Sequence, residues 1–333
     1  MKTSTTKIIA FGIIMLVLLS IFQLPIMAAS DDGVIILKKA DKEFIIYDKE
    51  NCDNEFEFAF SLTNDKSEEA SLNFTSSAKD QATEDALNVA YITEETYNQF
   101  FQSTKSAYVW IRDSKDKITV KAVDLKDALD DAKVNLVNST TKRIDIDTNQ
   151  THETNQIING VDTTVTTGKI VIKGSSNAKY YYQLSKASEG DYKEFFDLAN
   201  KINSGVTGTY NQLETAKQFY DLYTKLQPSA NDSNWNEVEN MEILQPEDTK
   251  EGDKYIIWLK EENTDKTTMD AKFLISTYQY EDKWEPEQIV LKELVKLPVT
   301  YDSIALFVIL AILVAAIVVV AILKAKSSKK ENK

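Results

Sequence analysis

Histidine and cysteine supply many of the bases, nucleophiles and metal ligands of enzymes, and this chain of 333 residues has one of each, His152 and Cys52. A Ser-His-Asp or Cys-His arrangement would therefore depend on His152 alone. That residue lies in the polar segment TNQTHETNQ, which we expect to be an exposed loop. The sequence contains no His-Glu-x-x-His motif, no multi-cysteine zinc pattern and no glycine-rich phosphate loop. We therefore predict a non-enzymatic protein with no catalytic residue, no cofactor and no metal ligand.

Carboxylates are abundant, but their spacing selects no site. Asp145, Asp147 and Asn149 form a D-x-D-x-N run of the kind found in calcium loops. An EF-hand would also need glycine at its sixth position and glutamate at its twelfth, and glutamine stands at both. Isoleucine alternates with the two aspartates, so an amphipathic strand explains the run more simply. A glycosidase that uses two carboxylates stays open as an alternative, because nothing singles out one pair.

Tyr180, Tyr181 and Tyr182 form the one cluster of candidate ligand-contact residues. Consecutive aromatic side chains could offer a platform for a sugar ring. In a strand, however, successive side chains point to opposite faces, so we expect at least Tyr181 or its neighbours to be buried.

The elements that would position these residues follow from the periodicity of the sequence. Strands are expected where aromatic or β-branched residues recur, in several cases alternating with polar ones, at residues 43–48, 55–62, 88–92, 107–112, 118–123, 142–147, 163–173, 179–184, 255–260, 271–278 and 288–295. Two apolar stripes at helical spacing predict a helical hairpin over residues 191–226, with a capping box at Thr209 and Gln212. We expect this hairpin to bury its stripes against the strands or against each other.

A weak internal repeat suggests how these elements are divided. NVAYI (88–92) is similar to NMEIL (240–244), and VWIRD (109–113) is similar to IWLKE (257–261). We predict a mainly β fold with an α-helical insertion: a first β-sandwich domain over residues 31–138 and a second over 139–300 that carries the hairpin. Trp110 and Trp258 are expected in the cores of the two sandwiches. Chance similarity between strand-rich segments is the alternative explanation of the repeat.

Both ends of the chain are typical of an exported membrane protein. Two lysines, an apolar stretch and small residues predict a signal peptide over residues 1–29, with an uncleaved membrane helix as the alternative. Residues 304–323 are all apolar and, as a helix, would be about 30 Å long, enough to cross a bilayer. Five lysines in residues 324–333 predict a cytoplasmic tail. We therefore expect one C-terminal transmembrane helix in the cell membrane and an extracellular N-terminal part.

The exported part is strongly acidic and has no disulfide. Without the leader and the tail, 31 basic and 51 acidic residues remain, a net charge of −20. Such a surface repels nucleic acid and anionic lipid, so no nucleic-acid partner is expected. A single cysteine excludes an intramolecular disulfide and points to a bacterial envelope without oxidative folding.

Two segments resemble parts of known families. Residues 108–123 (YVWIRDSKDKITVKAV) resemble the last hairpin of bacterial immunoglobulin-like repeats, which implies Ig-like sandwiches and no chemistry. Leu297-Pro298-Val299-Thr300, placed just before the apolar span and the lysines, resembles the sortase sorting signal of Gram-positive, clostridial-type surface proteins. That signal continues with glycine, and Tyr301 stands in its place. We therefore expect sortase cleavage to be blocked or slowed and the membrane anchor to be retained.

Together these features predict a membrane-anchored bacterial cell-surface protein that acts as an adhesin or as an envelope-interaction module. Its partner would be an extracellular protein or a glycan. The alternatives are a carbohydrate-binding or carbohydrate-acting surface protein, and a purely structural stalk. The helical hairpin is the least generic segment, and we considered it the place where a specific partner would bind.

The membrane anchor can be tested by cell fractionation. The full chain should stay in the membrane pellet after extraction at high pH, because an apolar helix of this length spans the bilayer. Removal of residues 304–333 should release the protein into the medium. A full chain that is found in the medium or attached to the cell wall would contradict the prediction.

Overall fold

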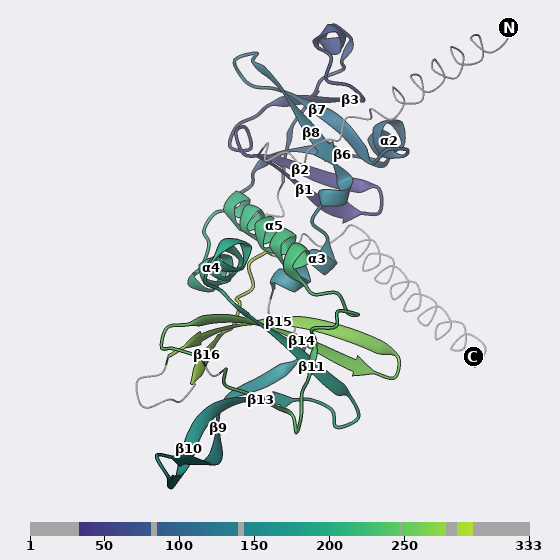
Figure 1. Cartoon of the computed structure of the whole chain (residues 1–333). Helices are drawn as coiled ribbons and strands as arrows, with labels where there is room; N and C mark the ends of the chain where they lie inside the picture. The colour runs from purple at the N-terminus through teal and green to yellow at the C-terminus, as the bar shows by residue number, and fades with distance from the viewer. Residues whose placement is uncertain (1–32, 81–84, 139–142, 247, 278–284, 296–333) are drawn as a thin grey trace, which may run out of the picture.

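The computed structural model describes residues 33–80, 85–138, 143–246, 248–277 and 285–295 (Figure 1). The predicted signal peptide, sorting motif Leu297 to Thr300, membrane helix and tail lie outside these residues. Within them, no helix has both the length and the apolar composition that a membrane crossing requires. The described part is mainly β, as predicted, with antiparallel sheets and two long helices.

The first half of the chain forms two antiparallel four-stranded sheets. One has the order β1 (Val34–Ala40), β2 (Glu43–Asp48), β6 (Asn88–Ile92), β5 (Ala78–Lys79). The other has the order β4 (Thr75–Ser76), β3 (Glu57–Ser61), β7 (Ser106–Arg112), β8 (Ile118–Asp124). Phenylalanines of β3 and aliphatic residues of β2, β6 and β7 form one core between them, an arrangement consistent with a β-sandwich. Short helices lie between and after these strands: η1 (Lys66–Ser71), α2 (Glu94–Thr96), η2 (Tyr97–Phe101), η3 (Leu125–Asp127) and α3 (Asp131–Val137).

The second half repeats this plan. One sheet has the order β13 (Glu242–Leu244), β10 (Val161–Lys173), β9 (Asp145–Ile158). The other has the order β12 (Asn236–Glu237), β11 (Lys179–Lys186), β14 (Lys254–Asn263), β15 (Lys266–Ser276), β16 (Pro286–Ile289). Isoleucines of β9 and β10 and apolar residues of β14 form the core between them. We refer to the two sheet pairs as the first and second sandwich.

The strand order supports the predicted repeat. In the first sandwich Ala59 of β3 lies opposite Trp110, and two positions earlier Glu57 pairs with Ser76 of β4. In the second sandwich Gln183 of β11 lies opposite Trp258, and two positions earlier Tyr181 pairs with Glu237 of β12. The two halves therefore share strand order and register around the tryptophan strand. In both halves a helical segment precedes the short strand. Between β3 and β4 it is only η1, and between β11 and β12 it is the hairpin of α4 (Gly190–Ser204) and α5 (Thr209–Leu226).

The two tryptophans are buried, but they do not lie in the cores of the sandwiches, so that expectation was wrong. Val109 and Ile111 point into the first core, and Trp110 points to the other face of its sheet because neighbours in a strand alternate. Trp110 donates its indole N–H to Ser61 Oγ at 2.7 Å. Trp258 likewise lies on the outer face of its sheet, where the helical hairpin covers it.

The helical hairpin lies between the two sandwiches and joins them (Figure 1). Helix α5 contacts β1 of the first sandwich and α3, while α4 contacts β14 and β16 of the second. One continuous apolar cluster contains residues from the outer face of β1 and β2, from both helices and from the outer face of β14 and β15. The hairpin therefore buries its apolar stripes on its own chain. A partner of this segment would have to bind its polar face.

At the centre of this apolar cluster, the ring centroid of Phe195 lies 4.8 Å from that of Phe219, 4.9 Å from that of Phe273 and 6.0 Å from that of Trp258. Polar contacts hold the other side of the hairpin to the first sandwich: Tyr210 donates to the carbonyl of Gly33 at 2.8 Å. The predicted capping box is absent, because helix α5 begins after Gly208 and the Thr209 N–H donates to Asp85 at 2.6 Å.

The end of the described chain is tied to this middle layer. Asn138, the last residue before the gap that follows α3, donates to the Val295 carbonyl at 2.6 Å and accepts from Leu294 N–H at 2.9 Å. Leu291, Leu294 and Val295 pack into the same apolar cluster as the hairpin. The strand expected over residues 288–295 is therefore only partly correct, since β16 ends at Ile289 and the rest is extended chain bound to α3.

His152 does not lie in a loop, as we expected, but in strand β9, where its partner is Thr167 of β10. Polar residues can form this part of β9 because backbone pairing with β10 holds the strand, and this pairing requires no apolar side chains. The β9–β10 hairpin extends well past the second core. Of the hairpin residues in that core, Ile146 on β9 and Ile170 on β10 lie nearest to the turn. We call residues 149–167, which lie between these two and include the turn, the arm.

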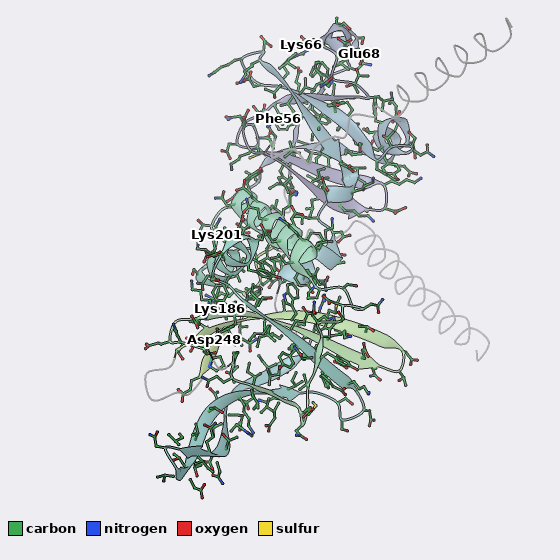
Figure 2. All side chains as sticks on the ribbon, in the orientation of Figure 1. Phe56, Lys66, Glu68, Lys186, Lys201 and Asp248 are labelled. Carbon is green, nitrogen blue, oxygen red and sulfur yellow. The ribbon has the colours of Figure 1, made fainter. Side chains whose placement is uncertain are left out.

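Loss of the aromatic centre should destabilise the whole described protein. We expect Phe195→Ala to lower the free energy of unfolding by about 3–5 kcal/mol, the usual cost of removing a buried phenylalanine. Urea denaturation would measure this change. Lys201→Ala, on the exposed face of the same helix (Figure 2), should change stability by less than about 0.5 kcal/mol. Equal effects of the two substitutions would contradict the central role of the hairpin.

Candidate functional site

A groove of about 940 Å³ opens along one edge of the first sandwich. Its apolar lining is Phe58, Phe60, Leu62, Leu72, Tyr91 and Phe100, contributed by β3, the β3–β4 connection, β6 and η2. Serine and threonine hydroxyls and the carboxylates of Glu68 and Glu95 surround this apolar floor. A cavity of this size, in which these apolar side chains lie beside a larger number of polar ones, has the volume of a ligand site. Glu68 marks its outer end, on η1 at the top of the molecule in Figure 2.

The groove exists because the first sandwich lacks strand pairing on this edge. Strand β4 pairs with β3 only at Glu57 and Phe58. The backbone of Phe56 bonds to Ser77 on the β4 side, so by alternation Phe60 N–H and C=O also point to that side. In the described chain no strand pairs with Phe60 there. On the facing sheet β5 pairs with β6 only at Asn88 and Val89, which leaves the rest of β6 open on the same side.

The floor of the groove is aromatic. Phe58 and Phe60 have ring centroids 5.7 Å apart, and Phe60 lies 6.2 Å from Phe100 and 5.7 Å from Phe101. Leu62 at the mouth is 59% exposed, although it is a large apolar side chain. The described residues that line the groove include two carboxylates and no lysine or arginine. The site therefore favours an apolar ligand that is neutral or positively charged.

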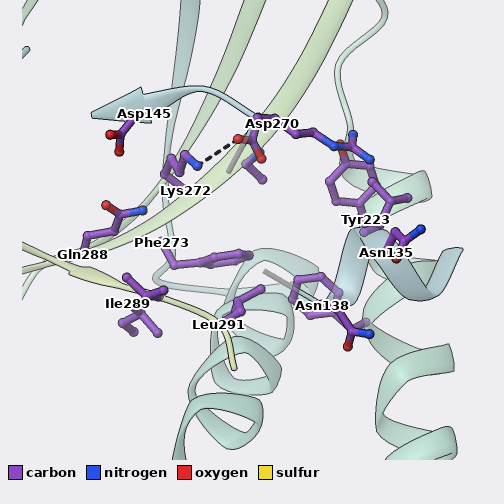
Figure 3. A pocket seen from close by; sticks show the side chains of 15 residues that line it. Asn135, Asn138, Asp145, Tyr223, Asp270, Lys272, Phe273, Gln288, Ile289 and Leu291 are labelled. Carbon is purple, nitrogen blue, oxygen red and sulfur yellow. Dashed lines mark hydrogen bonds and ion pairs between the residues drawn. The ribbon is translucent and has the colours of Figure 1, made fainter. Parts of the chain in front are cut away.

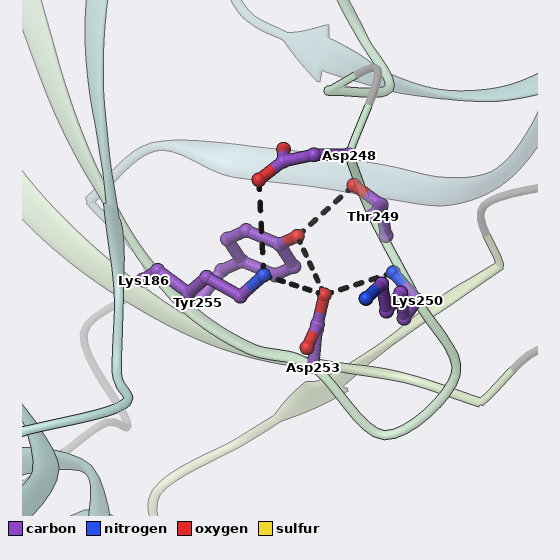
Figure 4. Close-up of polar contacts among 6 residues, drawn as sticks. All are labelled: Lys186, Asp248, Thr249, Lys250, Asp253 and Tyr255. Carbon is purple, nitrogen blue, oxygen red and sulfur yellow. Dashed lines mark hydrogen bonds and ion pairs between the residues drawn. The ribbon is translucent and has the colours of Figure 1, made fainter.

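The equivalent edge of the second sandwich is closed by polar contacts (Figure 4). By the register described above, Lys186 takes the place of Leu62. Lys186 Nζ lies 2.9 Å from Asp253 and 3.9 Å from Asp248. Tyr255 donates to Thr249 at 3.0 Å, and the Lys250 N–H donates to Asp253 at 2.8 Å. The open apolar groove is thus a property of the first sandwich, and the repeat itself does not require it.

The charges of this closing cluster stabilise each other. Burial opposes ionisation of Asp253, but hydrogen bonds from Lys186, the Lys250 backbone and Tyr255 outweigh it and lower the pKa of the carboxyl. The hydrogen bond to Asp253 raises the pKa of Lys186. Both groups therefore stay ionised around neutral pH.

The structure separates the three tyrosines proposed as ligand contacts. Tyr180 is buried in the second core and its hydroxyl accepts the Ser175 N–H at 2.9 Å, while Tyr182 packs against the same core. Tyr181 points to the opposite face, where Lys260 Nζ lies 4.4 Å from its ring centre and 5.2 Å from that of Trp235. Lys260 also donates to the Ala230 carbonyl at 3.1 Å. The tyrosines do not form one platform, and a sugar at Tyr181 would compete with Lys260.

A second cavity lies where α3 and α5 meet strands β15 and β16 (Figure 3). It holds about 70 Å³, room for very few water molecules, and Lys272 and Asp270 pair across it at 2.8 Å. Asp270 also accepts the Ile144 N–H at 3.2 Å. These groups satisfy each other, so the cavity is part of the junction between the hairpin and the second sandwich.

The cysteine and the carboxylate run considered in the sequence are each held in local contacts. Cys52 is buried, and burial raises the pKa of its thiol to about 11, so the nucleophilic thiolate is disfavoured. Asp147, in the run considered for calcium, accepts the Asn149 N–H at 3.0 Å and lies 3.2 Å from Lys173. Among the described residues no three histidine, cysteine, aspartate or glutamate side chains are grouped to hold a metal ion.

Comparisons with known proteins add no family to this geometry. No protein-family model matches the chain. A search of curated proteins likewise found no significant match. The function is therefore argued from the groove and its surroundings.

Sequence reasoning missed the groove, although one of its signals was visible. The run EFEFAFSL places Phe56, Phe58 and Phe60 on one face, and we expected a half-buried strand there. What the pattern did not show is that β4 and β5 are too short to cover this edge.

The polar closure of the second sandwich should be sensitive to acid. Because the folded pKa of Asp253 is lowered, its stabilising contribution is present above its unfolded pKa of about 3.9 and is lost as the pH falls through the folded value. We expect Asp253→Asn to cost about 1–2 kcal/mol at pH 7 and nearly nothing at pH 2. Thermal unfolding at several pH values would test this. Asp248→Asn is the matched control, because that side chain is 81% exposed and should matter little; parallel pH curves for wild type and Asp253→Asn would refute the expectation.

Proposed function

We propose that this chain is a membrane-anchored, non-enzymatic bacterial surface protein that binds a partner through the groove of its first Ig-like sandwich. The observation that carries the proposal is the open edge itself: an aromatic floor, an exposed Leu62 and an unpaired Phe60 backbone in one cavity of about 940 Å³. A free strand edge beside an apolar groove can accept an extended segment of a partner by β-strand addition.

The rest of the molecule is suited to present such a groove. The hairpin joins the two sandwiches through one continuous core, so the groove is held at one end of an elongated unit (Figure 1). An acidic exterior keeps an extracellular protein soluble and discourages non-specific contact with anionic surfaces. This arrangement supports an adhesin or envelope-interaction role better than a structural stalk, because a stalk has no need of an unfilled apolar groove.

The carbohydrate alternative draws less support from the geometry. Its candidate tyrosines face different directions, and a positively charged side chain covers Tyr181. A glycan could still use Tyr91 and the hydroxyls of the groove, so the same experiment should include glycans.

The proposal is tested by probing protein and glycan arrays with the exported part, residues 31–295, and with Leu62→Asp. The added carboxylate at the mouth should weaken specific binding by at least about tenfold, since it brings a third negative charge and removes apolar area. Leu62 is exposed, so the substitution should not affect folding.

Val290→Asp is the matched control, because Val290 is 55% exposed and lies on the second half of the chain, away from the groove. It should bind like the wild type. Binding that is lost equally in both variants, or retained in Leu62→Asp, would argue against the groove as the site. Hits confined to glycans would favour the carbohydrate alternative.

A further inference from the structure

The arm is the second unexplained feature of the molecule. It ends in a two-residue turn at Asn159 and Gly160, whose φ values of 52° and 81° are those of a hairpin turn. Three large apolar side chains are exposed at its tip: Ile157 at 74%, Ile158 at 43% and Val161 at 63%. They are three of the six exposed large hydrophobic side chains in the described chain, and a fourth, Leu62, lines the groove.

Nothing in the described part of the same chain supports the arm. Strand β13 covers β10 only from Lys169 to Val171, and in the described sheet β9 has a neighbour on one side only. A two-stranded ribbon with solvent on both faces is marginally stable in water. Its free edges are also templates for pairing, and between Thr148 and Ile158 no proline or lysine blocks the edge of β9. These are properties of a segment that gains its stability from a partner.

The arm and the groove complement each other. The groove offers an apolar floor, an open strand edge and negative charge at its rim, and it needs an extended, apolar segment without carboxylates. Residues 154–158 are extended, and residues 154–161, which include the turn, carry three exposed apolar side chains and contain no charged residue. Residues 154–161 are uncharged on a protein with a net charge of −20 outside its leader and tail, and Glu153 and Asp162 flank them.

The two features lie at opposite ends of the molecule, with the groove beside β3 and α2 and the arm at the far end of β9 and β10 (Figure 1). An arm therefore reaches the groove of another copy and not that of its own chain. A contact between two different surfaces of identical copies produces open chains, or rings where the rotation between copies closes.

The point at which the described chain ends is compatible with such chains on a membrane. Val295 is held at the middle of the molecule by Asn138, so neither the groove nor the arm is next to the exit point. If the span begins at residue 304, as proposed above, fewer than ten residues connect it to Val295. These residues can reach at most about 30 Å. Anchored copies would then lie alongside the membrane with both ends free.

We propose that the tip of the arm, residues 154–161, inserts into the groove of a second copy of this chain and links copies head to tail. The inference rests on the groove as a binding site, as in the proposed function, and it names a second copy as the occupant. Ile158 and its cross-strand neighbour Val161, which share one face of the ribbon, fill the apolar floor, while a strand of the arm pairs with the open edge at Phe60.

Cysteine cross-linking of the full chain tests the contact. The natural Cys52 is buried and should not react, so new cysteines report on their own positions. Gln156→Cys marks the arm and Thr63→Cys marks the groove; both side chains are exposed. Two differently tagged proteins, one with each substitution, are mixed in membranes or detergent and treated with a short bis-maleimide. Lys201→Cys, exposed on α4, is the control for random collision.

We expect cross-links between the arm cysteine and the groove cysteine to exceed those of the control by about tenfold or more, and a variant with both cysteines to give a ladder of products. Adding Ile158→Ser and Val161→Ser should reduce the ladder by about tenfold or more, because burial of each apolar side chain contributes a substantial factor in affinity. A dominant arm-to-arm product, or no product above the control, would overturn the proposal.

The array experiment separates this inference from the proposed function. If Leu62→Asp loses an external ligand and no ladder forms, the groove is a binding site but its occupant is not a second copy. If the ladder forms and no array ligand depends on Leu62, self-assembly stands and the adhesin use of the groove fails.

Discussion

The structure depends most on the apolar layer formed by the helical hairpin. Phe195, Phe219 and Tyr223 present aromatic surface to Trp258 and Phe273 of the second sandwich, while Tyr210 and Leu213 belong to the same cluster as Ile35 and Tyr47 of the first. Sheets that are apolar on both faces need cover on the outside as well as inside. The hairpin supplies that cover for two sheets at once, and this makes one folding unit of two sandwiches that have separate inner cores.

This constraint fixes where the free surfaces can be. The inner faces and the faces toward the hairpin are used, so the surfaces left for contacts are the edges, the ends and the outer faces of the two sheets that the hairpin does not cover. The two sandwiches treat the same edge differently. In the second, Lys186 and two aspartates close it with charge, and in the first, Leu62 and three phenylalanines leave it apolar and open. The two sandwiches thus have the same register around the tryptophan strand, and they differ in this edge.

Buried polar contacts complete the frame around this layer. Lys121 on β8 reaches across the first sandwich to Asp48 at the end of β2, and both side chains are almost fully buried. Asn138 satisfies two backbone N–H groups and one carbonyl of the terminal segment. Pairs of this kind contribute more to a unique arrangement than to net stability, because desolvation offsets much of their attraction. Here they define the relative position of the sheets and of the last described residues.

The sequence by itself determined the elements of the fold. Most strands, both long helices, the β7–β8 hairpin and the internal repeat follow from local periodicity, since alternation and helical spacing are written in neighbouring residues. It could not place Trp110 and Trp258 on the outer faces, because alternation tells which residues share a face and not which face meets which layer. It could not show that polar β9 continues as a strand past His152, since that strand depends on hydrogen bonds to β10. The groove, finally, arises where β4 and β5 stop short of covering β3 and β6, and such an absence between distant segments exists only in the tertiary structure.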